Sequence, residues 1–185
     1  MNTREQAEKK ILEFLDSEKR TMVLSGTHMF KKHKLILRIL AEQYENLKIL
    51  FRVNSLKNTN SRDFFGFEAQ TGRPYELREN ILYIDSMNTK SWQRTPKNFD
   101  IIIFYPAGSL YNKNSLEVKN NLQDIFYRKN VNKIIFVTCQ EGEYSNISYL
   151  KEYDDIVHIK YDSEEDDKEY HKRVVKSQCE LNFDK

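Results

Sequence analysis

Glycine and proline are scarce in this chain, which has five glycines and three prolines among 185 residues. This scarcity excludes a collagen-like or low-complexity polypeptide, because both are rich in these residues. Hydrophobic residues make up 39% of the sequence and charged residues 31%, a balance that favours folding over disorder. Since domains usually contain about 100 to 200 residues, we expect a single domain over residues 1–185.

Cysteines and long apolar runs are also scarce. Cys139 and Cys179 are the two cysteines, which are too few for a disulfide framework or a four-cysteine zinc site, so we expect reduced thiols. No apolar run approaches the roughly 18 residues of a membrane-spanning helix. The opening residues MNTREQAEKK lack the apolar core of a secretory signal. These features predict a cytoplasmic protein without a membrane segment.

Charge is distributed unevenly, although the formal net charge is only +2. Between Arg20 and Arg62 there are nine basic residues and two acidic ones, whereas Asp162 to Glu169 contains six acidic residues and one lysine. Local fields of this kind decide which partners approach a surface. The acidic segment is either a solvated loop or a segment that lies over the basic face and competes with a polyanion.

Short apolar runs alternate with segments of helical periodicity along most of the chain. Helices are predicted at 3–18, 32–44, 116–127 and 168–176, and strands at 21–25, 47–53, 81–84, 99–104, 133–138, 156–161 and 179–183. Residues 55–80 show neither period, which predicts an irregular excursion, and Trp92 falls in a polar connection. The run FDIIIF at 99–104 is continuously apolar, as is typical of a central strand with both faces covered.

Strands that alternate with helices predict a three-layer α/β/α sandwich with a mainly parallel sheet. We expect an N-terminal helix in residues 1–19, a core over 20–161, and an acidic segment, helix and edge strand in 162–185. In such sheets ligands bind beyond the carboxyl ends of the strands. The loop after the first strand is therefore the first place to look for a site.

That loop resembles the phosphate-binding loop of P-loop NTPases, which has a glycine, four residues, a second glycine, a lysine and then a serine or threonine. In VLSGTHMFKKH, residues 23–33, Gly26 matches the first glycine and Lys32 matches the lysine. Lys31 replaces the second glycine, and His33 replaces the residue whose hydroxyl binds magnesium. The motif is thus partly eroded.

A second segment, FDIIIFYPAG at 99–108, is similar to the Walker B strand of helicases and RecA-like proteins, where an apolar run ends in Asp-Glu-Ala-His. Tyr105 and Pro106 replace the two acids, and Gly108 replaces the histidine. Thr138 stands where this family has a polar residue that senses the nucleotide. The order and spacing of these segments identify residues 20–161 as similar to a RecA-like, P-loop-derived domain with degenerate Walker motifs.

These departures remove parts that phosphoryl transfer needs. Magnesium requires a hydroxyl and an acid, which His33, Tyr105 and Pro106 do not supply. Lys31 places a side chain where the backbone would approach a phosphate closely. Because each lost electrostatic contact costs roughly 10² to 10³ in rate, little turnover would remain. We expect no catalytic residue, no cofactor and no bound metal, and the histidines have no spacing suited to a metal site.

Anion binding requires less, because helix N-terminal amides and lysines can bind an anion without magnesium. The candidate phosphate-binding residues are Gly26, Lys31, Lys32 and Lys34. The alternative is that these lysines form the solvated face of a helix.

Basic and aromatic residues are interleaved in and around the excursion, a pattern that can contact phosphates and stack on unpaired bases. The candidate nucleic-acid-binding residues are Arg52, Lys57, Arg62, Arg73, Trp92 and Arg94. The alternative is that the phenylalanines of the excursion, Phe64, Phe65 and Phe67, belong to the core.

Three functions remain open. The first is a noncatalytic, regulatory RecA-like module that contacts single-stranded nucleic acid or a protein of the helicase or replication type, as the resemblance implies. The second is an atypical nucleotide-binding enzyme in which Lys31 or Lys32 holds phosphate and Asp85 or Asp100 serves magnesium. The third is a protein-interaction scaffold or homo-oligomer without an anion site. The sequence leaves the oligomeric state undetermined.

Overall fold

A seven-stranded sheet forms the centre of the protein in a computed structural model that describes residues 2–110, 115–139, 149–150 and 152–183. The strand order is β3-β4-β2-β5-β6-β1-β7. The strands are β1 (Thr21–Ser25), β2 (Lys48–Val53), β3 (Pro74–Leu77), β4 (Asn80–Ser86), β5 (Asn98–Tyr105), β6 (Asn130–Val137) and β7 (Ile156–Lys160). Neighbouring strands run parallel except for β3 and β4. The mainly parallel sheet is confirmed, and β5 lies in its middle.

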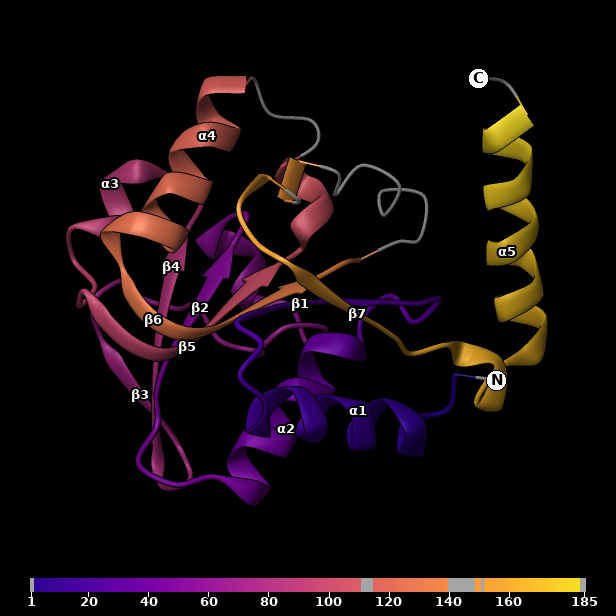
Figure 1. The fold of residues 1–185 in the computed structure, drawn as a ribbon, viewed down its shortest axis with the longest axis horizontal. Coiled ribbons are helices and arrows are strands. Elements are labelled where there is room, and N and C mark those ends of the chain that lie inside the picture. Colours follow the sequence, from indigo (N-terminus) through magenta and orange to yellow (C-terminus); the bar gives the residue numbers. More distant parts are fainter. Residues whose placement is uncertain (1, 111–114, 140–148, 151, 184–185) are drawn as a thin grey trace.

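Helices cover both faces of this sheet. They are α1 (Arg4–Asp16), α2 (Lys32–Gln43), α3 (Thr89–Trp92), α4 (Ser115–Gln123) and α5 (Lys168–Phe183). Figure 1 shows α1 and α2 below the sheet and α3 and α4 above it, while α5 stands to one side beyond β7. The expected three-layer α/β/α sandwich is therefore confirmed.

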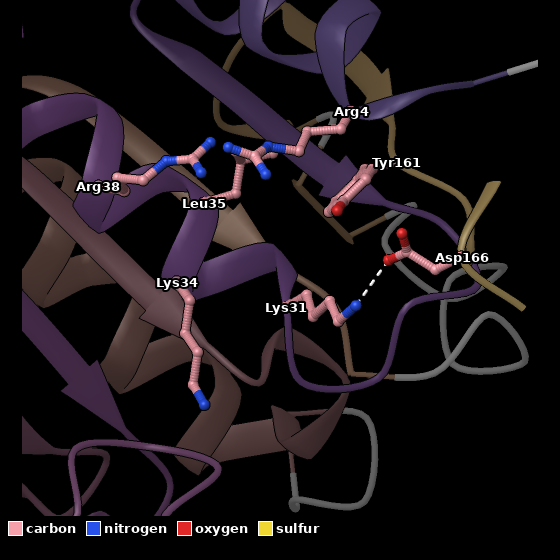
Figure 2. A pocket seen from close by; sticks show the side chains of 7 residues that line it. All are labelled: Arg4, Lys31, Lys34, Leu35, Arg38, Tyr161 and Asp166. Atoms are coloured by element: carbon pink, nitrogen blue, oxygen red, sulfur yellow. Dashed lines mark hydrogen bonds and ion pairs between the residues drawn. The ribbon is translucent and has the colours of Figure 1, made fainter.

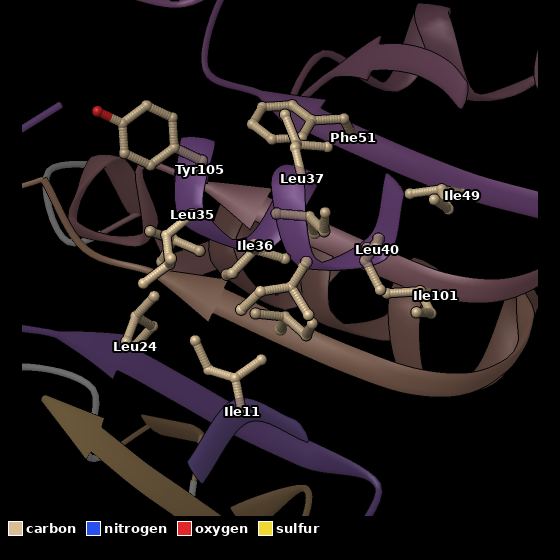
Figure 3. Packing of buried hydrophobic residues seen from close by; sticks show 14 of the residues in the cluster. Ile11, Leu24, Leu35, Ile36, Leu37, Leu40, Ile49, Phe51, Ile101 and Tyr105 are labelled. Atoms are coloured by element: carbon tan, nitrogen blue, oxygen red, sulfur yellow. The ribbon is translucent and has the colours of Figure 1, made fainter. Parts of the chain in front are cut away.

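Two hydrophobic clusters hold the layers together. One joins Ile11 of α1 and Ile36 of α2 to strand residues such as Leu24 and Phe51 (Figure 3). The other lies on the opposite face, where residues of α4 and the following π-helical turn meet β5 and β6. Alternate residues of β5 belong to different clusters, with Ile103 in the first and Phe104 in the second. This two-sided burial explains why the strand reads as an unbroken apolar run.

A capping residue sets the start of helix α1. The Thr3 hydroxyl accepts a hydrogen bond from the Gln6 N–H at 3.3 Å, which caps α1 where the sequence predicted it.

The predicted irregular excursion contains a 3₁₀ turn at Leu56–Asn60 and the short antiparallel strand β3. After the 3₁₀ turn, a backbone hydrogen bond from the Gly66 N–H to the Ser61 oxygen at 3.0 Å closes a second turn. The excursion is thus ordered and packs on the sheet edge.

Two predictions about local structure were wrong. Residues 179–183 were expected to form an edge strand, but they continue helix α5. No glycine or proline follows Lys168 to stop that helix, and each added residue gains one backbone hydrogen bond. Trp92 was expected in a polar connection, but it ends the short helix α3 and is 7% exposed.

In the described part of the chain, no helix combines the length and apolar character that crossing a bilayer requires. The boundaries proposed at residues 19 and 161 stay predictions. Helix α1 packs against both α2 and β7, so the piece before the core and the end of the core are in contact.

Candidate phosphate loop and basic surfaces

The loop between β1 and α2 is shaped by a close approach of the chain just after β7. Gly26 has a φ of +121°, and a Cβ atom at this position would lie 2.0 Å from the Tyr161 carbonyl oxygen. The Tyr161 N–H donates to the Ser25 oxygen at 2.8 Å, which fixes this contact. The glycine therefore makes room for the protein's own backbone.

Lys32 fills the inside of this loop. Its side chain is fully buried, and its ammonium group donates to the carbonyl oxygens of Gly26 and His28 and, at 3.4 Å, to that of Cys139. Carbonyl oxygens attract a cation and repel a phosphate. The lysine that would bind phosphate in a P-loop NTPase is thus bonded here to carbonyl oxygens of its own chain.

The acidic segment after β7 lies against the same loop. The Thr27 N–H donates to Asp162 Oδ1 at 3.0 Å, and the Thr27 hydroxyl lies 2.9 Å from both Ser163 Oγ and His171 Nδ1. A backbone amide that could bind an anion is thus occupied by a carboxylate of the chain. Of the two interpretations of this segment, a solvated loop or a segment on the basic face, the contacts favour the second.

Lys31 and Lys34 point away from Lys32. Lys31 Nζ lies 2.6 Å from Asp166 Oδ2, and Lys34 Nζ donates to the Arg62 oxygen at 3.0 Å. Of the four predicted phosphate-binding residues, the structure brings Gly26 and Lys32 together inside the loop, whereas Lys31 and Lys34 line a pocket beside it. The other two lysines are exposed on the first turn of α2 and face different neighbours.

Residues at the two magnesium positions of the resemblance pack against each other. The rings of His33 and Tyr105 are stacked with centroids 4.3 Å apart, and the Tyr105 hydroxyl donates to the Met29 oxygen at 3.2 Å. Burial lowers the pKa of His33 to about 3, and repulsion from Lys34 adds to the effect. The imidazole is therefore neutral at physiological pH.

The two acids suggested for magnesium are in use elsewhere. Asp85 is fully buried and accepts two hydrogen bonds from Arg52 at 2.8 Å. Asp100 accepts the Lys48 N–H at 2.8 Å near the start of β5. Five residues separate Asp100 from the end of β5, a distance of about 16 Å along the strand. Within the described residues, no group of three or more histidine, cysteine, aspartate or glutamate side chains could hold a metal ion.

Arg52 and Trp92, two of the predicted nucleic-acid contacts, lie in the interior. The Arg52 guanidinium also donates to Asp124 at 2.8 Å and lies 4.6 Å from the Trp92 ring centroid. Burial alone would lower the pKa of Arg52, but the two carboxylates raise it instead. The indole N–H donates to the Ser86 oxygen at 2.8 Å. Both side chains are therefore structural in this conformation.

The remaining predicted contacts are exposed and lie on or beside the excursion. Lys57 and Arg62 belong to its first half and Arg73 to its end, directly before β3. Arg94 follows α3. A Cβ at Gly72 would lie 2.7 Å from the Arg94 carbonyl oxygen, so the backbone just before Arg73 lies close to Arg94 in space. Four predicted cations are thus exposed, three of them on the excursion and Arg94 beside it.

The excursion also exposes the ring of Phe67, which contacts Tyr75, a partly buried residue that packs against the core. Phe67 is 39% exposed, its ring centroid is 5.1 Å from that of Tyr75, and the Arg73 guanidinium lies 5.6 Å from the Tyr75 centroid. By contrast, Phe64 and Phe65 pack against the core. Two of the three phenylalanines therefore follow the core alternative, and the third is available for contacts.

A pocket of about 300 Å³ lies at the start of α2, and sequence reasoning missed most of it. Its lining consists of Arg4, Lys31, Lys34, Leu35, Arg38, Tyr161 and Asp166 (Figure 2). The spacing of residues 31, 34 and 38 places three cations on one helix face, a signal that the sequence contained. Arg4 and Asp166 come from distant parts of the chain, so only the tertiary fold reveals them.

Comparison with known proteins shows similarity in structure alone. No protein family and no curated protein matches the sequence. The large terminase from a thermophilic bacteriophage, in a second crystal form, aligns with a TM-score of 0.58 and 10% identity over 93% of this chain and 48% of the terminase chain. A third crystal form of that terminase, in complex with ADP, aligns with a TM-score of 0.51 and 10% identity over 84% and 45% of the two chains.

The chain therefore spans about half the length of the terminase chains it resembles. At 10% identity, the likeness establishes the fold and leaves the chemistry to be argued from the residues. The protein therefore has the predicted three-layer α/β/α fold with a mainly parallel sheet, and this fold resembles part of the terminase structures.

Proposed function

We propose that this chain is a noncatalytic, regulatory RecA-like module that binds single-stranded nucleic acid through the excursion at residues 55–80. Its partner protein would be of the helicase or replication type. The proposal rests on a contrast between two surfaces. The groups that bind phosphate in a P-loop NTPase are used inside the chain, whereas the cations of the excursion and the ring of Phe67 face solvent.

The observation that carries the proposal is the group formed by Phe67, Tyr75 and Arg73. An exposed aromatic ring accepts a stacked base of any sequence, and an adjacent guanidinium can contact the phosphate. Lys57, Arg62 and Arg94 are further exposed cations on or beside the excursion. We leave Arg52 and Trp92 out of the proposed interface because both are buried.

Binding of a labelled oligothymidylate, measured by fluorescence anisotropy at several salt concentrations, tests the proposal. Neutralising about four to six phosphates predicts a log-log salt slope near −3 to −4. Phe67→Ala should weaken binding by about fivefold to 150-fold, because one stacked base contributes about 1–3 kcal/mol. The combined change Lys57→Gln, Arg62→Gln and Arg73→Gln should flatten the salt slope.

Two controls test whether binding depends on this surface or on any exposed aromatic ring and any positive charge. Tyr127→Ala removes an aromatic side chain that is 71% exposed on the π-helical turn after α4. Lys9→Gln with Lys10→Gln removes positive charge from exposed positions of α1. Neither control should change binding appreciably. A salt-independent signal, or equal losses in Phe67→Ala and Tyr127→Ala, would reject the proposed interface.

An atypical nucleotide-binding function is the second candidate, and the ADP complex of the similar terminase is the observation in its favour. The internal bonds of Lys32 and the pairing of Asp162 with the loop argue against it. Thermal unfolding with and without magnesium and ADP distinguishes the two, because a ligand that binds the native state raises the melting temperature. We expect no rise.

A further inference from the structure

The pocket beside α2 is positively charged although it contains an acid. Four cationic side chains line it, from Arg4, Lys31, Lys34 and Arg38, against one lining carboxylate, that of Asp166. Figure 2 shows Lys34 turned away from the others, in agreement with its bond to the Arg62 oxygen. The charge of the pocket itself therefore comes from Lys31 and the two arginines.

The two arginines are held together by one carboxylate behind the pocket. Arg4 Nε donates to Glu8 Oε1 at 2.8 Å, and Arg38 Nη2 donates to the same oxygen. A guanidinium has five N–H donors, so this shared acceptor leaves further donors on each side chain. Leu35 and Tyr161 form the walls between the arginines and Lys31.

Asp166 is the anion now present at this site. Its Oδ2 lies 2.6 Å from Lys31 Nζ and 3.3 Å from His28 Nε2, and its side chain is 45% exposed. An ion pair this exposed contributes little, typically about 0–1 kcal/mol, so a competing anion can replace it at low cost. The neighbouring Asp162, by contrast, is bound to the Thr27 N–H and to Asn2. The segment can thus stay attached while Asp166 moves.

We propose that this pocket binds a phosphate group, which replaces the Asp166 carboxylate at Lys31 and also bonds to Arg4 and Arg38. Arginine suits this role because its planar fork matches two phosphate oxygens. The site shares Lys31 with the end of the loop between β1 and α2, but Lys32 does not line it and none of its lining residues belongs to the excursion. It is therefore independent of the proposed nucleic-acid surface.

Calorimetric titration of the full chain with inorganic pyrophosphate tests the site. Asp166→Asn removes the competitor and should tighten binding by about twofold to fivefold, the equivalent of one exposed ion pair. Glu164→Gln makes the same change in charge within the same segment, but Glu164 does not line the pocket, so affinity should stay near the wild-type value. Lys31→Ala and Arg38→Gln should weaken binding.

A double-mutant cycle shows whether Asp166 acts through Lys31. In the Lys31→Ala background, Asp166→Asn should no longer tighten binding, because the pair it breaks is already absent. Equal affinities of Asp166→Asn and Glu164→Gln, or an unchanged affinity in Lys31→Ala, would overturn the proposal. So would the absence of pyrophosphate binding in every variant.

Competition experiments identify where the phosphate comes from. Displacement of pyrophosphate by an unphosphorylated oligothymidylate indicates a backbone phosphate of nucleic acid. Displacement only by the 5′-phosphorylated form indicates a terminal phosphate. Displacement by neither indicates a small phosphorylated molecule.

Discussion

His33 and Tyr105 stack on each other with an interplanar angle of 27°, and the rings of Phe51 and Phe64 lie near the imidazole. By resemblance to P-loop NTPases, positions 33 and 105 are those of the hydroxyl and the carboxylate that hold magnesium. In this chain they form part of an aromatic cluster. A hydroxyl and a carboxylate buried here without a metal would lack partners. The replacement of the hydroxyl by His33 is therefore consistent with the replacement of the carboxylate by Tyr105.

Acidification should destabilise the protein through His33. The unfolded histidine takes up a proton near pH 6.5, but burial keeps the folded one neutral until about pH 3. The contribution of the neutral His33 to the free energy of unfolding is therefore complete above pH 6.5, and it is lost as the pH falls below that value. At pH 5 the loss is about 2 kcal/mol. Urea denaturation at pH 7 and pH 5 measures it.

A phenylalanine at position 33 isolates this contribution. His33→Phe keeps a ring against Tyr105 and removes the titration, so about 2 kcal/mol of the loss between pH 7 and pH 5 should disappear. His28, whose pKa burial lowers to about 4, accounts for a further share. His158→Gln, at an exposed position of β7, should keep the full pH dependence. An identical pH dependence in His33→Phe and wild type would contradict the argument.

Lys32→Ala should act on stability. The change leaves the Gly26 and His28 carbonyl groups without their buried donor, at a cost of about 2–4 kcal/mol. Lys31→Ala, at the adjacent but exposed position, should cost less than about 1 kcal/mol. The free energy of unfolding in urea compares the two. Equal values would mean that Lys32 is not a structural lysine.

Most of the architecture could be predicted from the sequence because it depends on local patterns. The apolar run of β5, the helical period of α2 and the capping residue Thr3 each act within a few residues. The end of α5 was missed because five alternating residues are a weak signal beside a helix that nothing interrupts. Trp92 was missed because polar neighbours in the sequence do not reveal the buried Arg52 beside it.

The candidate site was less predictable, since its contacts join residues far apart in the chain. The match of Gly26 and Lys32 to a phosphate loop was visible, but the sequence did not indicate that Tyr161 and the loop carbonyls would occupy it. The sequence left open whether the acidic segment is a solvated loop or lies over the basic face. Which carboxylate meets which group, Asp162 at Thr27 and Asp166 at Lys31, depends on the turn after β7.

Arg52→Ala should be strongly destabilising. Removing the guanidinium leaves Asp85 and Asp124 buried without their shared partner, which costs about 3–5 kcal/mol. Arg52→Lys should recover only part of this, because an ammonium cannot reproduce the two parallel bonds to Asp85. Thermal and urea unfolding measure the losses. If Arg52→Ala kept its stability and lost only oligonucleotide binding, the buried position would be incorrect.

Gly26→Ala distinguishes the two purposes that a glycine can have in this loop. A methyl group would meet backbone atoms of Tyr161 at 2.0–2.7 Å, and backbone cannot rotate away as a side chain can. We expect a loss above about 4 kcal/mol or a failure to fold. Gly66→Ala is the matched control, because Gly66 also has a positive φ, +75°, but nothing lies within 4 Å of the added atom. It should cost only about 1–2 kcal/mol.

In a working phosphate loop the glycine makes room for a ligand, so an alanine at this position would impair ligand binding more than folding. Similar stabilities of Gly26→Ala and Gly66→Ala would therefore favour a loop open to phosphate over one closed by its own chain.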